Sequence, residues 1–193
     1  MSKNILIMGV GGQGLVLATE IVANAAMLAG LQVKTNDVIG LSQRGGMVWG
    51  SIRYGEVVHS ANVPIGKGDV LLGMEPLEAL RGSRLLKEGA TIILNTEEVY
   101  PSPVIQEQAQ YPREEIAALK DKFKVIEVNA KEEAKAAGNI KTANTVQLGI
   151  LAAVLDDIKK ETFLEAVVSF VPEKAVEANK KAFERGYQIG KGK

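Results

Sequence analysis

The stretch Asn4-Ile5-Leu6-Ile7-Met8-Gly9-Val10-Gly11-Gly12-Gln13-Gly14 decides the fold of this 193-residue chain. Its first half is a continuous apolar run, which is typical of a parallel strand that is covered on both faces. Its second half fits the pattern G-x-G-x-x-G and leads into residues 15–29, whose alanine- and leucine-rich composition predicts a helix. A glycine-rich turn that opens a helix presents backbone amides and the positive end of the helix dipole to an anion. We therefore expect cofactor or anion contacts in this turn, at Gly9, Gly11, Gly12, Gln13 and Gly14.

The same turn leaves two other interpretations open. A dinucleotide site also needs an acidic side chain at the end of the second strand, where it binds the ribose hydroxyls. Residues 31–35 begin such a strand, and Asp37 is the candidate acid, although it comes slightly late. One alternative is therefore a free-standing NAD(P)-binding oxidoreductase, and the other is a turn that is structural and holds no ligand.

A second loop, Ser42-Gln43-Arg44-Gly45-Gly46, combines hydrogen-bond donors with two glycines. An arginine in such a loop can bind a phosphate or a carboxylate through two parallel hydrogen bonds, and adjacent amides can join it. Many surface loops carry arginine and glycine without a ligand, so residue type alone favours a ligand site and a ligand-free surface loop equally. The candidate contacts here are Ser42, Gln43, Arg44 and Gly45.

The rest of the chain predicts an α/β fold, a Rossmann-like three-layer sandwich with a mostly parallel sheet, an inserted β-hairpin and a helical C-terminal part. At this length a single domain over residues 1–193 is the natural interpretation. We expect the hairpin to pair residues 47–54 with residues 57–60. Further strands are expected at 69–74, 91–95 and 124–128, helices at 75–88, 113–122, 130–137, 142–155, 161–169 and 173–188, and a loop at 96–110.

The composition excludes several kinds of site. The chain has no cysteine, which rules out iron–sulfur clusters held in the usual way, thiolate zinc sites, disulfides and a cysteine nucleophile. Its one histidine, His59, follows two valines, and a lone histidine in such a place is more often structural than catalytic. We therefore predict neither a catalytic residue nor a metal site in this chain.

Charge and hydropathy bear on partners and location. The 23 basic residues balance the 23 acidic ones, which argues against a nucleic-acid surface. No apolar run approaches the roughly 20 residues that a membrane span needs. The N-terminal run meets glycine at once and lacks a signal-peptide cleavage pattern, so we expect a cytoplasmic protein.

Taken in order, seven segments resemble the gamma subunit or gamma domain of 2-oxoacid:ferredoxin oxidoreductases. They cover nearly the whole chain, and the two glycine-rich loops are among them. Asn95-Thr96 and the loop at Pro101–Pro103 look most like the beta subunit of indolepyruvate ferredoxin oxidoreductase, which carries the same domain. The segments are residues 9–14, 40–46, 48–53, 68–72, 75–81, 144–149 and 179–186.

The resemblance implies a subunit of an enzyme that decarboxylates a 2-oxoacid on thiamine diphosphate and Mg²⁺, passes electrons through iron–sulfur clusters to ferredoxin, and forms an acyl-CoA. In that family the thiamine diphosphate and the clusters lie mainly on other subunits, while the gamma domain helps to complete the assembly and the coenzyme A region. We therefore expect a thiamine-binding subunit and an iron–sulfur subunit as partners. We expect the isolated chain to be inactive, either as a monomer or as a homodimer. The composition agrees, because the chain has no cysteine and Gly68-Asp69 is followed by Val70, not by the glycine of a thiamine motif.

Overall fold

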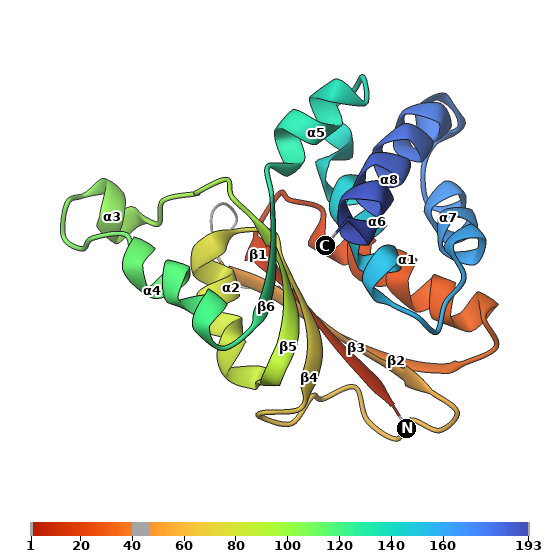
Figure 1. Ribbon diagram of the computed structural model, residues 1–193, viewed down its shortest axis with the longest axis horizontal. Coiled ribbons are helices and arrows are strands. Elements are labelled where there is room, and N and C mark those ends of the chain that lie inside the picture. The colour runs from red at the N-terminus through yellow and green to blue at the C-terminus, as the bar shows by residue number, and fades with distance from the viewer. Residues whose placement is uncertain (1, 40–46, 193) are drawn as a thin grey trace.

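A six-stranded mixed sheet runs through the centre of the computed structural model, which describes residues 2–39 and 47–192 (Figure 1). The strands lie in the order β2-β3-β1-β4-β5-β6. β1, β4, β5 and β6 are parallel neighbours, whereas β3 is antiparallel to both β1 and β2. Their bounds are β1 Lys3–Val10, β2 Gln32–Ile39, β3 Met47–Gly55, β4 Gly68–Gly73, β5 Leu86–Asn95 and β6 Lys124–Val128.

Helices cover both faces of the sheet and make the three layers (Figure 1). α1, α5, α6, α7 and α8 pack on one face, and α2 and α4 pack on the other. The expected α/β sandwich with a helical C-terminal part is confirmed. The bounds are α1 Leu15–Leu28, α2 Pro76–Gly82, α3 Ser102–Ile105, α4 Arg113–Ala117, α5 Ala130–Ala136, α6 Ala143–Val154, α7 Lys160–Ser169 and α8 Val176–Lys191.

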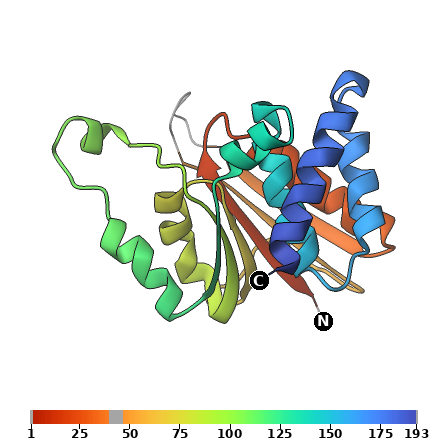
Figure 2. The same cartoon turned by 45° about the horizontal axis from the view of Figure 1, so that its top comes forward.

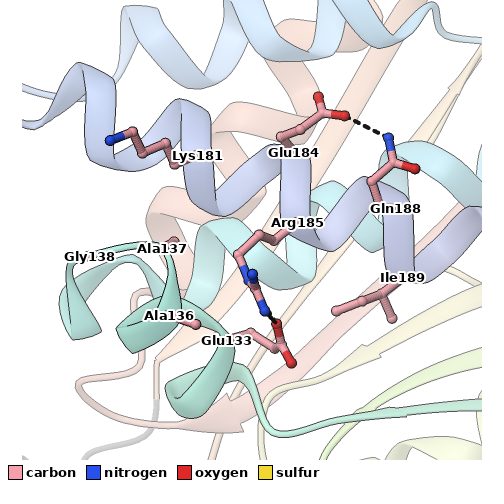
Figure 3. Close-up of a pocket in the computed structure, with 9 residues that line it drawn as sticks. All are labelled: Glu133, Ala136, Ala137, Gly138, Lys181, Glu184, Arg185, Gln188 and Ile189. Atoms are coloured by element: carbon pink, nitrogen blue, oxygen red, sulfur yellow. Dashed lines mark hydrogen bonds and ion pairs between the residues drawn. The ribbon is translucent and has the colours of Figure 1, made fainter.

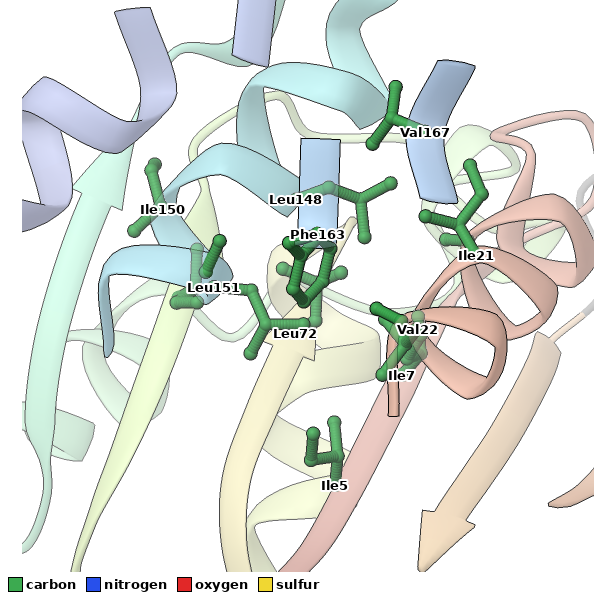
Figure 4. Close-up of a cluster of buried hydrophobic side chains, with 14 of the residues drawn as sticks. Ile5, Ile7, Ile21, Val22, Leu72, Leu148, Ile150, Leu151, Phe163 and Val167 are labelled. Atoms are coloured by element: carbon green, nitrogen blue, oxygen red, sulfur yellow. The ribbon is translucent and has the colours of Figure 1, made fainter. Parts of the chain in front are cut away.

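The apolar run of β1 is buried because successive side chains enter opposite layers. Ile5 and Ile7 face α1 and the C-terminal helices, where Phe163 and Leu148 fill the larger core (Figure 4). Leu6 and its neighbour Met8 point the other way, into a smaller core under α2. A continuous apolar strand thus indicated a sheet that is covered on both sides, and the structure confirms it.

The inserted hairpin is present, but the expected pairing of residues 47–54 with residues 57–60 is wrong. β3 forms its hairpin with β2, and it lies between β1 and β2, so that the first and second strands are not neighbours. Residues 57–60 are not a strand, and His59 is exposed among them. Because β2 is an edge strand with polar, exposed positions, its sequence gives only a weak pairing signal.

Three local expectations also need correction. The helix expected over residues 75–88 ends at Gly82, continues as a 3-10 turn over Ser83–Leu85, and is followed directly by β5 from Leu86. The helix expected over 113–122 is α4 followed by a 3-10 turn, Ala118–Asp121. The loop expected at 96–110 contains the short helix α3, which projects from the body (Figure 2).

Candidate functional site

The Gly9–Gly14 turn lies at a topological switch point of the sheet. β1 and β4 are adjacent and parallel, but the helix after β1, α1, covers one face, whereas the helix after β4, α2, covers the other. Chain segments that leave neighbouring strands in opposite directions open a crevice at the carboxyl edge of the sheet, and this is where open α/β folds bind ligands. The fold therefore places the predicted turn where a ligand site is expected on topological grounds.

Three positions of the turn require glycine because of backbone conformation or lack of space, independently of any ligand. Gly12 and Gly14 have φ values of 97° and 77°, in the left-handed region that side chains rarely adopt. At Gly9 an added Cβ would lie 3.0 Å from the Cβ of Met74 and would also collide with the Gln13 side chain. Gly11 differs, because its φ is not positive and a Cβ there would meet nothing within 4 Å. Of the predicted contact residues, Gly11 thus presents backbone to open space without a structural reason to be glycine.

The side chain of Gln13, a predicted ligand contact, is used inside the protein. Its Oε1 accepts a hydrogen bond from the backbone N–H of Val10 at 2.9 Å, and its Nε2 donates to the carbonyl oxygen of Met74 at 2.9 Å. Gln13 therefore shapes the turn and joins it to the end of β4, which leaves the backbone amides of the turn as its binding groups.

Two further amide side chains converge on the end of β4, and the sequence did not single them out as site residues. Asn95, at the end of β5, donates to the Met74 carbonyl at 3.0 Å, and Gln147, buried on α6, donates to the Gly73 carbonyl at 3.2 Å. The Asn95 side chain also accepts from the backbone N–H of Ala130, the first residue of α5, at 3.1 Å. Both lie in segments that carry the family resemblance, and the local signal was a polar residue that ends an apolar strand (Asn95) or that lies within the apolar stretch of α6 (Gln147).

A cavity of about 460 Å³ opens beside the turn, within the size range of small-molecule sites. The turn forms one wall, and Lys131, Lys141 and Asn144 contribute polar groups. Lys131 is paired with Glu97, which also lines the cavity. The N-cap of the 14-residue helix α1 is Gly14, so no side chain caps its first amides, and its first turn holds no acidic residue. Free amides, a helix dipole and a lysine together suit a phosphate or another anion.

The second predicted loop, Ser42, Gln43, Arg44 and Gly45, lies outside the described residues. The strands that it joins end at Ile39 and begin at Met47, and Met47 pairs with Val10, the second residue of the glycine turn. The contacts predicted for Ser42–Gly45 remain predictions.

Asp37 is not placed to complete a dinucleotide site. It lies on β2, and β3 separates that strand from β1 and from the glycine turn. Its carboxylate occupies the space over Gly50 that a side chain there would fill. An acid that binds the ribose hydroxyls must end a strand adjacent to β1, so the strand order itself argues against the NAD(P) alternative.

Buried acids follow β4, but their hydrogen bonds are structural. Glu75 caps α2 by accepting from the N–H of Glu78 at 2.9 Å, and it also accepts from the N–H of Val99 at 3.2 Å and from the Tyr111 hydroxyl. Burial, followed by the bond to Glu75, raises the pKa of Tyr111 far above its usual value. Glu75 therefore holds residues 96–111 against α2.

A larger hollow, about 740 Å³, lies between α5 and α8 (Figure 3). Four of its polar side chains are already paired, since Arg185 donates to Glu133 at 2.9 Å and Gln188 donates to Glu184 at 2.7 Å, and Lys181 is the one further charged side chain of its lining. It offers no converging set of free donors. Among residues 2–39 and 47–192, no three His, Asp or Glu side chains are grouped as a metal ion would require, and no helix is long and apolar enough to cross a membrane.

Comparison with known proteins gives one consistent result. Residues 4–189 match the family model described as "Pyruvate ferredoxin/flavodoxin oxidoreductase". The chain is 38% identical to the indolepyruvate oxidoreductase subunit IorB of Thermococcus kodakarensis, over 97% of this chain and 96% of that one. It is 28% identical to the 2-oxoglutarate synthase subunit KorC of Methanocaldococcus jannaschii, over 99% and 95%. The crystal structure of the keto/oxoacid ferredoxin oxidoreductase gamma subunit from Geobacter sulfurreducens superposes with a TM-score of 0.78 at 28% identity, covering 98% of this chain and 97% of that one. None of these findings supports an NAD(P)-binding enzyme.

Proposed function

The chain belongs to the pyruvate ferredoxin/flavodoxin oxidoreductase family, and from this premise we propose that it is the gamma-type subunit of a thiamine-diphosphate-dependent 2-oxoacid:ferredoxin oxidoreductase. Relatives along its full length are subunits of 2-oxoacid oxidoreductases, so the family resemblance inferred from the sequence is confirmed. Identity to the indolepyruvate subunit, 38%, exceeds the 28% to the 2-oxoglutarate subunit. We therefore propose an aryl 2-oxoacid such as indolepyruvate as the substrate of the complex.

In this proposal the redox chemistry belongs to partner subunits. A thiamine-binding and an iron–sulfur partner would carry thiamine diphosphate, Mg²⁺ and the clusters, and electrons would leave to ferredoxin. The lack of cysteine in the sequence supports this division, because clusters are held by cysteine thiolates.

We assign to this chain the binding of coenzyme A phosphates at the glycine turn. The observation that carries the assignment is the position of the turn at the switch point, where residues 10–14, which end at the N-cap of α1, line one cavity together with Lys141. The donors fit a phosphate, since they are backbone amides and a cation, and Gly11 leaves room for close approach. Ser42, Gln43, Arg44 and Gly45 would add contacts from the neighbouring loop. When coenzyme A is bound there, it supplies the thiol that accepts the acyl group.

The subunit assignment is tested by reconstitution. The isolated chain should not turn over a 2-oxoacid with coenzyme A and a viologen acceptor, and activity should appear when the thiamine- and cluster-bearing partners from the same cells are added. Turnover by the isolated chain would refute the assignment. Saturable binding of NADH to it, followed by fluorescence, would favour the alternative oxidoreductase.

The site is tested separately with Gly11→Ala. Because the added Cβ meets no atom within 4 Å, the variant should fold and assemble normally, and any effect reports on the ligand. We expect the KM for coenzyme A to rise about tenfold, because the added methyl group keeps the phosphate away from the amides and weakens about one charge-assisted hydrogen bond, while the KM for the 2-oxoacid stays unchanged. Lys141→Gln should act in the same direction, and the distant Lys180→Gln is the matched control. An unchanged KM for coenzyme A in both variants would reduce the turn to a structural element without affecting the subunit assignment.

A further inference from the structure

A second cavity, about 540 Å³, lies on the opposite face of the sheet from α1. Strands β1 and β3 form its floor, the end of α2 and the following 3-10 turn form one wall, and the loop after β3 forms the other. The wall is fixed closely against the floor, because Gly82 of α2 packs on the Met8 side chain with no space for a Cβ. The glycine turn does not line this cavity, and the cavity shares no lining residue with the one beside the turn.

The floor of the cavity suits a flat apolar group. Trp49 lies half-buried in it, next to Met8, its partner in the β1–β3 register. Met47 is 41% exposed and lines the same cavity, and Val63 and Leu85 close the sides. Indole faces stack on other aromatic rings, and thioethers make favourable contacts with ring edges. A partly buried tryptophan beside two methionines is therefore a surface for an aromatic ring.

The wall of the cavity is basic. Arg81 and Arg84 both line it, and both side chains reach solvent. The carboxylate of Glu78 accepts from Arg81 at 2.6 Å, which neutralises one of the two charges. Arg84 forms no ion pair with any residue in the described ranges, so a positive charge remains beside the apolar floor. Arginine binds carboxylates and phosphates with two parallel hydrogen bonds.

We propose that this cavity is a binding site for a small ligand in which a flat aromatic group is linked to an anion. The ring stacks over Trp49 and the methionines, and the anion pairs with Arg84. Two sources share this chemistry, an aryl carboxylate and a nucleoside monophosphate, and the volume admits either one.

The chain carries its own reporter for the test, because Trp49 is its one tryptophan. The full chain is titrated with 3-phenylpropionate and, in a parallel series, with AMP, while tryptophan emission is followed. We expect a saturable change in emission with at least one of them. A response to 3-phenylpropionate alone identifies the carboxylate source, and a response to AMP alone identifies the nucleotide. Saturation by neither overturns the proposal.

Two comparisons show whether the ring and the charge act together. Arg84→Gln should weaken binding about tenfold, as should replacement of 3-phenylpropionate by its neutral amide, because each removes one charged hydrogen-bond partner. Arg84 is exposed, so its variant should keep the wild-type circular dichroism. Lys180→Gln on α8 is the matched control and should bind like wild type. Equal affinities for Arg84→Gln and Lys180→Gln, or for the acid and its amide, would also overturn the proposal.

Discussion

The side-chain amide of Gln13 donates to the carbonyl oxygen of Met74 at 2.9 Å, so the turn after β1 is joined to the residue that follows β4. The same side chain accepts from the N–H of Val10 at 2.9 Å, which closes the turn from within. The two chain segments that border the switch-point crevice are therefore held as one unit. A ligand that approaches the amides of the turn meets a preformed surface.

Replacing Gln13 with leucine removes both hydrogen bonds and leaves the buried N–H of Val10 without a partner. Met74 keeps its bond from Asn95, so the main cost is one unpaired donor. We expect the free energy of unfolding to fall by about 2 kcal/mol, measured by urea denaturation. Gln108→Leu, on the exposed segment after α3, is the control and should change stability by less than about 0.5 kcal/mol. Equal effects for the two variants would show that the Gln13 bonds do not stabilise the turn.

The Tyr111 hydroxyl donates to Glu75 and accepts from the N–H of Leu77 at 3.1 Å, and it is the buried anchor of the segment that carries α3. Tyr111→Phe should destabilise this segment by about 2 kcal/mol, because it removes a hydrogen bond to a carboxylate. We expect faster proteolytic cleavage within residues 96–111, measured by mass spectrometry of the fragments. Tyr100→Phe removes a hydroxyl whose bonds to Glu98 and Arg113 are exposed to solvent, so it should raise the cleavage rate much less than Tyr111→Phe does. Unchanged cleavage in Tyr111→Phe would contradict the anchoring role.

Glu78 should make stability depend on pH. Burial raises the pKa of this carboxyl above 4.5, although the Arg81 charge acts in the opposite direction. The folded chain therefore keeps the proton to a higher pH than the unfolded chain, and stability falls as the pH rises from about 4.5 through the folded pKa. Glu78→Gln removes this fall, so its stability relative to wild type should increase from pH 4 to pH 7. Urea denaturation at a series of pH values measures it, with the exposed Glu177→Gln as control. A relative stability that decreased toward neutral pH would contradict the assigned direction.

Elements with a strong local pattern were predicted best from the sequence. The apolar runs in β1, β4 and β5 were found because strands covered on both faces need continuous apolar residues. The partner of β3 was missed, since pairing is a long-range property and the β2 edge strand carries polar residues such as Lys34 and Asn36. The end of α2 was placed too late, because nothing in the composition of residues 83–88 separates a 3-10 turn and an exposed strand start from a helix.

The glycine turn was predicted from the sequence, whereas its ligand contacts remain predictions. Its glycines were read from a local motif, and the fold places that motif at the switch point. The inward use of Gln13 could not be foreseen, because its partner Met74 is 61 residues away in the sequence. Asn95 and Gln147 were missed for the same reason, since each acts on the end of a strand that is distant in sequence.

The crossing of α6 and α8 gives a final prediction. Gly149 and Gly186 lie at the crossing, and a Cβ at either one would overlap a backbone carbonyl oxygen of the other helix, that of Phe183 or that of Val146. Backbone atoms cannot move aside as a side chain can, so the helices would have to separate and give up packing around Phe183, which is fully buried. Alanine is the better helix former by about 1 kcal/mol, but this gain is smaller than the cost of overpacking, about 3 kcal/mol at a rigid contact. We therefore expect Gly149→Ala and Gly186→Ala each to lower the free energy of unfolding by about 2 kcal/mol.

The double variant tests whether the two glycines share one contact. Once one substitution has separated the helices, the second overlap is partly relieved, so the double variant should lose less free energy of unfolding than the sum of the two single losses. Gly192→Ala is the matched control, because its Cβ would have 3.6 Å to its nearest neighbour and should change stability little. Urea denaturation of the four variants checks this, and strict additivity of the two helix glycines would show that they do not share one contact.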